Sequence, residues 1–393
     1  MIRISKKNLV YLFLIFPFFQ PGIFSLLQSL KIIDVIYDLW RCISIFIIII
    51  LFCTVCKIDK LLFFVFLYFS WILFSTLFKQ GSLVSFFSQC GSIAALCLLI
   101  SMCHRKGDMQ NLLKTIIGLL EFYLIINAIT VFIYAPQGGI VSDIESIRMK
   151  TNNYFLGYDN QHVYYILPYL ALSLIYDKFY CEVIKWRTII FHIIINVAVL
   201  ICWSADTVVA VVVFYLLLIT NKNKYINKLI NSYTVIAVNY IIFYFLVILT
   251  MSSRLSALME YILQKNIGSA REWIWANYLF YFYKSPIIGN GYLDIASRFS
   301  LTYASHAHNM YLDILFVSGI VGLLLFTIII FLTTNSGKDI LSESQKILII
   351  AIIAYMVAFQ ATANPYCPTF YLLLMLSYEA GSYDKYCANA VKG

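Results

Sequence analysis

The chain has 393 residues, of which 62% are hydrophobic and only 12% are charged, and its mean hydropathy is +0.85. Its apolar residues recur in long runs, and a soluble core cannot hide so much apolar surface. The composition therefore excludes a soluble globular protein and predicts a polytopic membrane protein. The net charge of +9 requires no nucleic-acid partner, because lysines and arginines in short cytoplasmic loops face anionic lipid.

The apolar runs predict an all-α integral membrane protein with about twelve transmembrane helices, within a range of 10–12, in a single domain over residues 1–393. The first run contains Pro17 and Pro21 and lacks a small-residue cleavage site, so we expect a retained span rather than a signal peptide. The predicted spans are residues 8–29, 42–56, 61–78, 83–103, 113–134, 163–176, 188–203, 207–220, 233–251, 309–333, 346–362 and 366–380.

The basic residues predict the orientation of these spans. With both termini in the cytoplasm, most of the 28 Lys and Arg residues fall in cytoplasmic segments, as the positive-inside rule requires. This topology places two longer connections, residues 135–162 and 252–308, on the extracytoplasmic face. Long structured loops commonly carry function, so we expect the chemistry of the protein in these two loops.

The longer loop contains a predicted helix. Residues 269–272 read S-A-R-E, a capping box that places Ser269 at the N-cap, and the proline after Ser285 ends the helix there. Arg271 falls in the first turn, where its guanidinium can join free backbone N–H groups in binding a phosphate. The alternative is that Arg271 only pairs with Glu272 or another neighbouring carboxylate.

A turn and a pair of histidines follow this helix. The turn at Gly289 and Gly291 lacks the strand and the third glycine of a nucleotide-binding loop, so we reject a nucleotide site. Asn309 is the predicted N-cap of the span that follows His306 and His308. Only two metal ligands are in view, whereas an imidazole at the water boundary suits general acid/base chemistry, so we expect no metal.

The order of these features resembles the C-terminal signature of the O-antigen polymerase and ligase superfamily, the Wzy-like, undecaprenyl-diphosphate-dependent polymerases of polysaccharide repeat units. A helix with an arginine and a tryptophan is followed by S-P-I-I-G-x-G and then by H-N-x-Y-L, which leads into a span with G-I-x-G. The residues that carry the resemblance are Arg271, Trp275, Ser285, Pro286, Gly289, Gly291, His308, Asn309, Tyr311, Leu312, Gly319 and Gly322. Each element is common by itself, but the ordered combination in a polytopic chain is specific.

Two earlier segments fit the same resemblance. The loop that holds Arg148, Lys150 and Asn160 is similar to the pattern of arginine, glycine and asparagine that precedes a central span in this family. Ser204 stands where the family often has a serine followed by an arginine, but Ala205 takes the place of the arginine here, so no role is carried over to that turn. A solvated surface loop is the alternative interpretation of Arg148 and Lys150.

The resemblance implies a GT-C-like fold and an inverting, metal-independent glycosyl transfer, without a cofactor, on the outer face of the bacterial plasma membrane. The donor would be a glycan on undecaprenyl diphosphate, and the acceptor one lipid-linked repeat unit of an O-antigen, capsule or exopolysaccharide. The expected partners are this lipid-linked oligosaccharide and the lipid bilayer, together with a flippase and a chain-length regulator of the same pathway.

The same chemistry assigns roles to the candidate residues. A sugar hydroxyl must lose its proton as it attacks the anomeric carbon, and we expect His308 to accept that proton as general base. Arg271 and Arg148 are expected to stabilise the charge on the leaving diphosphate. The residues expected to bind substrate are His306, Asn309, Lys150, Asn160, Gly289 and Gly291.

Three other functions stay open at this level. A ligase that transfers the finished glycan to another acceptor has an overlapping sequence pattern. A metal-dependent transferase would want an acidic pair in the first outer loop, where Asp34 and Asp38 lie four residues apart. A flippase for lipid-linked oligosaccharides would need many charged residues within its spans, and few are found here, among them Glu121 and His192.

Overall fold

The computed structural model describes residues 5–55, 57–140, 152–223, 230–249, 271–335, 341–362 and 365–390. The described chain is helical apart from one short hairpin of two strands, in which Asn153 pairs with Tyr158 and Tyr154 with Gly157. The all-α class is confirmed in this sense. Predictions for Arg148, Lys150 and Ser269 lie outside the described residues.

In the order of the chain, short 3₁₀ or π turns, labelled η, separate the α-helices. The N-terminal elements are α1 (Lys6–Ile15), η1 (Phe16–Phe19), α2 (Ile23–Leu26), η2 (Gln28–Leu30), α3 (Lys31–Cys53), α4 (Lys60–Phe78), α5 (Leu83–Phe86), η3 (Phe87–Gly91), α6 (Ser92–Arg105), α7 (Met109–Tyr134) and η4 (Ala135–Gln137). The central and C-terminal elements are β1 (Asn153–Tyr154), β2 (Gly157–Tyr158), η5 (Asp159–Gln161), α8 (Val163–Tyr180), α9 (Trp186–Cys202), α10 (Ala205–Thr220), α12 (Ser232–Phe243), η6 (Tyr244–Leu249), α14 (Arg271–Lys284), α15 (Ile295–Thr302), α16 (Met310–Thr334), α17 (Glu343–Ala358) and α18 (Pro368–Ala390).

Several of these helices can cross a bilayer. Within the described residues, five are long and apolar enough: Gln28–Cys53, Lys60–Phe78, Leu83–Arg105, Met109–Gln137 and Met310–Thr334. Shorter apolar helices cover Trp186–Cys202, Ala205–Thr220 and Ser232–Ile248. The protein is therefore a polytopic membrane protein, and the number of twelve spans stays a prediction.

The first predicted span differs from the observed structure. Residues 8–29 do not form one helix, because α1 ends at Ile15 and a 3₁₀ turn and the short α2 follow. Pro17 lies in that turn and Pro21 follows it, and a proline lacks the N–H that helix continuation needs. The helix that crosses next, α3, begins at Lys31, well before the predicted start at residue 42.

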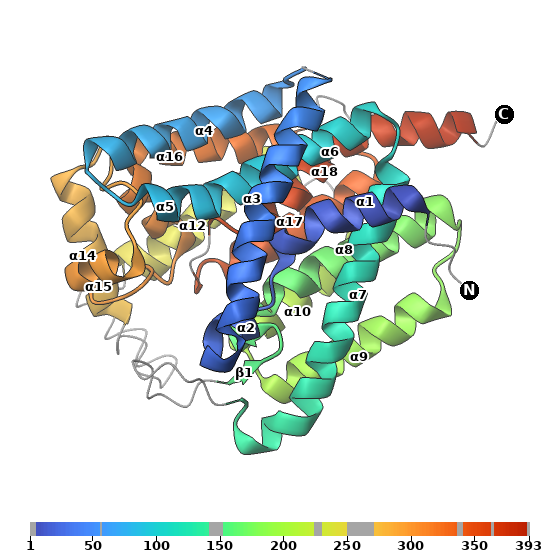
Figure 1. The fold of residues 1–393 in the computed structure, drawn as a ribbon, viewed down its shortest axis with the longest axis horizontal. Coiled ribbons are helices and arrows are strands. Elements are labelled where there is room, and N and C mark those ends of the chain that lie inside the picture. Colours follow the sequence, from blue (N-terminus) through green and yellow to red (C-terminus); the bar gives the residue numbers. More distant parts are fainter. Residues whose placement is uncertain are drawn as a thin grey trace.

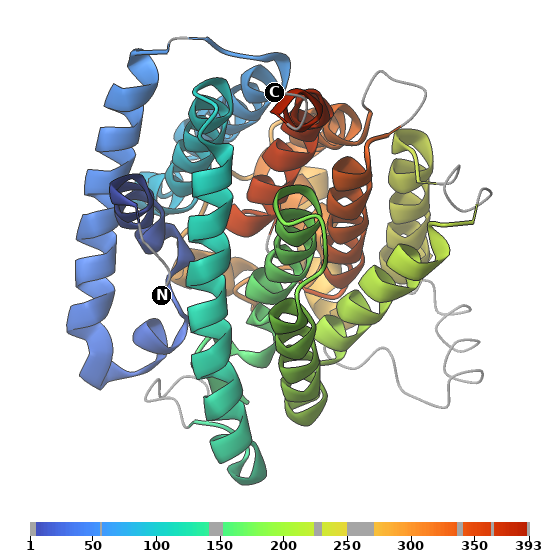
Figure 2. The ribbon, with the colours of Figure 1, turned by 90° about the vertical axis from the view of Figure 1, so that its right-hand side faces the viewer.

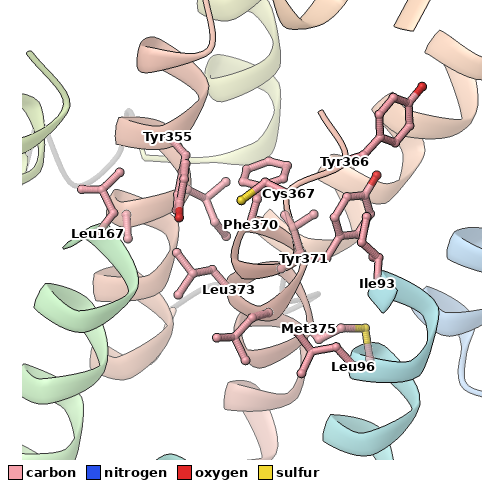
Figure 3. Close-up of a cluster of buried hydrophobic side chains, with 14 of the residues drawn as sticks. Ile93, Leu96, Leu167, Tyr355, Tyr366, Cys367, Phe370, Tyr371, Leu373 and Met375 are labelled. Carbon is pink, nitrogen blue, oxygen red and sulfur yellow. The ribbon is translucent and has the colours of Figure 1, made fainter. Parts of the chain in front are cut away.

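The core of the bundle is built around α18. Phe370, Tyr371 and Leu373 of this helix have no exposed surface, and Figure 3 shows them between side chains of α6, α8 and α17. Leu96 of α6 and Leu167 of α8 are equally buried. A helix that is apolar on all sides is stable only when neighbours surround it, which explains the central position of α18.

The two ends of the bundle differ (Figure 1). The start of α1 and the end of α18 lie at one end, whereas α14 and α15 lie at the other. The view from the side of the termini shows both of them in front (Figure 2). The long loop predicted to carry the chemistry is therefore separated from the termini by the length of the bundle.

Ion pairs join helices at the end that carries the termini. Lys7 of α1 lies 2.7 Å from Asp108, Arg105 of α6 lies 3.4 Å from Asp59, and His104 lies 3.1 Å from Glu379 of α18. Lys178 of α8 pairs with Glu343 of α17. The lysines of the Lys7–Asp108 and Lys178–Glu343 pairs are exposed, so these two pairs contribute little stability each, whereas the side chains of the other two contacts are mostly buried.

Candidate active site

α14 carries Arg271 and packs against the bundle. It runs from Arg271 to Lys284, in agreement with the predicted helix that ends at Ser285. The ring of Tyr278 lies 4.8 Å from that of Phe316 in α16, and both side chains are fully buried. This packing fixes the helix, and so fixes the backbone position from which Arg271 extends.

Side chains of α14 hold the histidine loop, residues 303–309. The indole Nε1 of Trp275 donates a hydrogen bond of 2.9 Å to the carbonyl of Ala307. The hydroxyl of Tyr278 donates one of 3.5 Å to the carbonyl of Ala304. The arginine helix and the histidine loop therefore form one packed unit, which explains why the arginine and the tryptophan occur together in the signature.

The backbone of this loop is strained at the histidine that we expect to act as base. His308 has φ 50° and Tyr303 has φ 57°, which is left-handed backbone that L side chains rarely adopt. Such conformations cost on the order of 1–3 kcal/mol and persist only where the surroundings enforce them. Here Ala307 is bound on both sides, since its N–H donates to Asp313 Oδ1 at 3.3 Å and its carbonyl accepts from Trp275.

The two histidines of the loop lie in contact. Their ring centres are 4.1 Å apart, and Ser305 Oγ lies 2.9 Å from His306 Nδ1. Burial lowers the pKa of His308 to about 3, with further lowering by His306 and Arg271. Burial also lowers the pKa of His306 to about 4, and the positive charges of Arg298 and Arg271 act in the same direction. Both imidazoles are therefore neutral near pH 7.

One nitrogen of this pair is left without a partner. His308 Nδ1 is buried and has no hydrogen-bond partner among the residues that the structure describes. Buried polar atoms are normally paired, and unpaired ones concentrate at functional sites. The unpaired Nδ1 of His308 therefore marks the histidine loop as a candidate functional site.

A buried ion pair between Arg298 and Asp313 lies next to the histidine loop. Arg298 of α15 lies 2.9 Å from Asp313 of α16, and these residues are only 6% and 2% exposed. The guanidinium also lies 5.6 Å from the ring centres of Tyr292 and Phe316. Because Asp313 additionally accepts the N–H of Ala307, this pair ties α15, α16 and the histidine loop together.

Asn309 is the N-cap of α16, as predicted. Its Oδ1 accepts from the N–H groups of Tyr311 at 3.0 Å and Leu312 at 3.1 Å. Its Nδ2 donates to the backbone and side-chain oxygens of Gln360, each at 3.1 Å, and the residue is fully buried. The amide is thus used within the protein to place α16, and binding of substrate by Asn309 stays a prediction.

The glycine turn docks into a break in α16. Gly319 interrupts that helix with φ 65°, and an added Cβ there would lie 2.3 Å from the carbonyl of Ile287. Because the helix breaks there, the carbonyl of Val317 is free to accept a hydrogen bond of 3.0 Å from the N–H of Gly291. A Cβ on Gly289 would lie 2.5 Å from the same carbonyl, so the close approach requires glycine. These contacts explain the glycines structurally, and their role in binding substrate stays a prediction.

Side chains of α4 complete the hydrogen bonds at this break. Trp71 Nε1 donates a hydrogen bond of 2.8 Å to the carbonyl of Ser318, and Ser75 Oγ donates one of 3.2 Å to the carbonyl of Val317. Figure 1 shows α4 and α16 side by side along the bundle. Backbone groups at membrane depth must be satisfied within the protein, so the broken helix depends on these donors.

We expect Gly319→Ala to destabilise the protein by about 1–3 kcal/mol, because alanine at this φ is strained and its Cβ meets the Ile287 carbonyl. The measurement is the thermal unfolding midpoint of the purified protein in detergent. Gly118→Ala is the matched control, since Gly118 lies within α7 and has nothing within 4 Å of an added Cβ. An unchanged midpoint for Gly319→Ala would contradict the docking role of the break.

The described end of the shorter loop, which precedes α8, contacts α10. Ser204 Oγ donates 3.1 Å to Asn160 Oδ1, and Thr207 Oγ1 donates 3.4 Å to the carbonyl of Asp159. Burial raises the pKa of Asp159 to about 6, and the nearby carboxylate of Asp206 acts in the same direction. Asn160 therefore belongs to a polar segment that the turn at Ser204 holds in place.

Arg271 is the point at which these parts converge. Its charge acts on His306 and His308 of its own loop and also on Tyr158 and Asp206, which belong to the other segment. The structure thus brings the described end of the shorter loop to the arginine of the longer one.

A comparison with protein families matches part of this chain. Residues 185–327 match the family model described as O-antigen ligase. This match supports the resemblance of the chain to the O-antigen polymerase/ligase superfamily. Members of this superfamily are glycosyltransferase-like enzymes, and the match agrees with the resemblance drawn from the sequence. No curated protein and no solved structure matches the chain.

The superfamily match covers only part of the candidate site. It begins just before α9 and ends within α16, so it includes the whole unit of α14, the glycine turn and the histidine loop. Asn160 and the rest of the shorter outer loop precede the matched residues.

The sequence alone did not predict some residues of the candidate active site. The pairing of Arg298 with Asp313 was missed, because fifteen positions separate them and both occur in segments that gave no ion-pair pattern. The sequence did not indicate Asp206, because Ala205 stands directly before it where the family often has an arginine. A signal for both existed, since carboxylates at the ends of apolar runs need a positive partner when buried. Within the described residues, no group of three His, Cys, Asp or Glu side chains could hold a metal ion.

Proposed function

We propose that this protein polymerises repeat units linked to undecaprenyl diphosphate, on the extracytoplasmic face of the bacterial plasma membrane. The reaction is an inverting glycosyl transfer from the diphosphate-linked glycan to a hydroxyl of an acceptor repeat unit. The observation that carries the proposal is the convergence of Arg271 with a neutral, incompletely bonded His308 on one packed unit.

The chemistry uses these two side chains in different ways. The acceptor oxygen forms a bond with the anomeric carbon while its proton passes to His308. The bond between that carbon and the phosphate oxygen breaks, and the diphosphate leaves with the electron pair. Arg271 stabilises the charge that develops on the diphosphate, by a fork of charge-assisted hydrogen bonds.

The electrostatics of the site make His308 a stronger base when substrate is bound. In the free protein, burial, His306 and Arg271 hold its pKa far below the ordinary 6.5. A diphosphate bound to Arg271 offsets the positive charge of that arginine and favours the protonated imidazole, so the pKa of His308 rises toward the range that suits a general base. The donor therefore activates the group that deprotonates the acceptor.

A ligase reaction is the second candidate, because the matched family model is described as O-antigen ligase. Ligase and polymerase share the donor and the leaving group, so the same Arg271 and His308 serve both. They differ in the acceptor, which for a ligase is a molecule other than a repeat unit.

The test is to mix the purified protein in detergent with lipid-linked repeat units and to follow the products by gel electrophoresis. A ladder of products that differ by one repeat unit supports polymerisation, because detergent leaves no compartments between which a flippase could act. Transfer only to an added non-repeat acceptor would replace the polymerase proposal by the ligase. The absence of any transfer would contradict both.

We expect Arg271→Lys to lower the initial rate of ladder formation by about 10- to 100-fold. Lysine keeps the charge but cannot form the two parallel hydrogen bonds, and a hydrogen bond to a charged group contributes about 1.5–3 kcal/mol. Lys284→Arg at the other end of α14 is the matched control and should keep the wild-type rate. Full activity of Arg271→Lys would show that forked recognition of the diphosphate is wrong.

A further inference from the structure

A small polar cavity lies outside the unit of α14 and the histidine loop. It has a volume of about 240 Å³ and is enclosed by the segment after α1, by α3, by the π turn η3, by η5 and by the start of α18. Its polar lining includes Gln20, Arg41, Gln89, Gln161, Tyr164 and Thr369. In a chain that is 62% hydrophobic, a cavity lined by polar side chains from several distant segments is a candidate binding site.

The cavity is built by a close approach of two backbones. The N–H of Gly22 donates 3.1 Å to the carbonyl of Leu156, which joins the segment after α1 to the shorter outer loop. Gly157 has φ 106°, and an added Cβ there would lie 3.0 Å from the Cα of Gly22 and 2.3 Å from Oε1 of Gln161. The glycine in the loop pattern therefore lets the Gln161 amide lie over this junction.

The charge of the cavity argues against an anionic occupant. Arg41 is the cation in its lining, and its guanidinium donates 2.8 Å to Asp38 Oδ1 and 2.6 Å to Gln20 Oε1. The arginine is thus neutralised and held by partners in the protein. A diphosphate would compete with Asp38 for it, whereas a neutral ligand with many hydroxyls can use the amides of Gln89 and Gln161 as donors and acceptors.

The shape of η3 supports the same interpretation. Residues Phe87–Gly91 form a π turn between α5 and α6, and π turns within helices occur frequently at functional sites. This turn presents Gln89, whose side chain is exposed, to the cavity. Tyr164 adds an aromatic ring to the lining. A pyranose has hydroxyls around its rim, which amides can bind, and an apolar face, which an aromatic ring can stack on.

Two sets of contacts link the lining of the cavity to the candidate active site. Gln161 directly follows Asn160, which accepts the hydroxyl of Ser204. The ring of Tyr164 lies 6.0 Å from that of Phe359, whose carbonyl accepts the N–H of Met310, two residues after His308. These contacts join the lining of the cavity to the segment that holds Asn160 and to the start of α16, which follows the histidine loop.

We propose that this cavity is a carbohydrate subsite, which holds one sugar ring of the repeat unit while transfer takes place at Arg271 and His308. The inference rests on the proposed function, since it names the part of the same substrate that lies beyond the reacting bond. The volume, below the roughly 300–1,000 Å³ of pockets that take drug-sized ligands, fits a single ring rather than a chain.

The test uses the free oligosaccharide of one repeat unit, released from its lipid by mild acid, and measures its binding to the purified protein by saturation-transfer NMR. We expect Gln89→Met and Gln161→Met each to weaken binding about fivefold, since methionine keeps the volume and removes about 1 kcal/mol of hydrogen bonding. Gln137→Met is the matched control, because Gln137 is exposed at η4 and does not line the cavity. Unchanged binding in both cavity variants would overturn the subsite.

The outcomes separate this inference from the proposed function. If the wild type forms ladders and the cavity variants bind the oligosaccharide as the wild type does, the subsite is wrong and the polymerase proposal stands. If the wild type binds the oligosaccharide, loses it in the variants and forms no ladder, the subsite stands and the polymerase proposal fails. Inorganic diphosphate serves as the second probe, and its binding should be equal in the wild type and both variants. Weakened diphosphate binding would mean that the cavity is an anion site.

Discussion

Replacing His308 by alanine is expected to lower the initial rate of ladder formation by about 10²- to 10⁴-fold, the usual contribution of a positioned general base. The geometry offers no equal substitute. His306 is the neighbouring imidazole, 4.1 Å away between ring centres, but its Nδ1 already lies 2.9 Å from Ser305 Oγ. Membranes that carry the variant should accumulate single lipid-linked repeat units.

Two further variants keep this result interpretable. His308 has left-handed backbone, which asparagine adopts more readily than most residues, so His308→Asn removes the imidazole with less strain. Its rate should fall as far as that of His308→Ala. His104→Gln lies at the opposite end of the bundle, where His104 contacts Glu379, and should polymerise normally. Polymer of undiminished length in either His308 variant would remove this histidine from the mechanism.

The second large effect is on folding. Arg298→Met is expected to destabilise the protein by about 3–5 kcal/mol, because it leaves the Asp313 carboxylate buried without its cation. The measurement is the thermal unfolding midpoint in detergent, together with the yield of folded protein. We expect the histidine loop to lose its position as well, since Asp313 also holds the N–H of Ala307.

The double variant Arg298→Met/Asp313→Leu separates the ion pair from simple loss of volume. Apolar side chains in place of a buried pair often recover the stability, so the midpoint should return most of the way to that of the wild type. Lys7→Met breaks the pair with Asp108 at the other end, where Lys7 is 63% exposed, and should cost below about 1 kcal/mol. A stable Arg298→Met protein would mean that the pair does not support the site.

Local patterns in the sequence predicted local structure correctly. The proline at 286 and the capping side chain of Asn309 act within one helical turn, and both helix boundaries were found where these residues placed them. Pro17 and Pro21 carry the same information, yet the high hydropathy of residues 8–29 predicts one span where the structure has two helices and a 3₁₀ turn. Hydropathy reports burial in lipid or protein and does not report whether the backbone continues as one helix.

The missed features all depend on contacts between distant segments. Gly319 belongs to the sequence signature, but only the docked turn of residues 285–291 shows why the helix must break there. The close approach of Gly22 to Gly157 likewise joins residues that are far apart in the chain. Spacing along the chain carries no information about such pairs, whereas the family resemblance includes Gly289, Gly291 and Gly319 in a fixed order.

The most direct test of the account is the pH profile of kcat/KM for ladder formation by the wild type and by Arg271→Gln. A general base must be unprotonated, and the pKa of His308 in the free protein is lowered to about 3, so the wild-type profile should stay flat from pH 7 down to pH 5. Removing the positive charge of Arg271 removes only one cause of the lowered pKa, since burial is the largest, so the variant should be slower and its pKa for His308 should rise without reaching the ordinary value. A wild-type profile that falls near pH 6.5, or an Arg271→Gln variant with the wild-type rate, would contradict the claim that Arg271 and His308 act together at one transfer site.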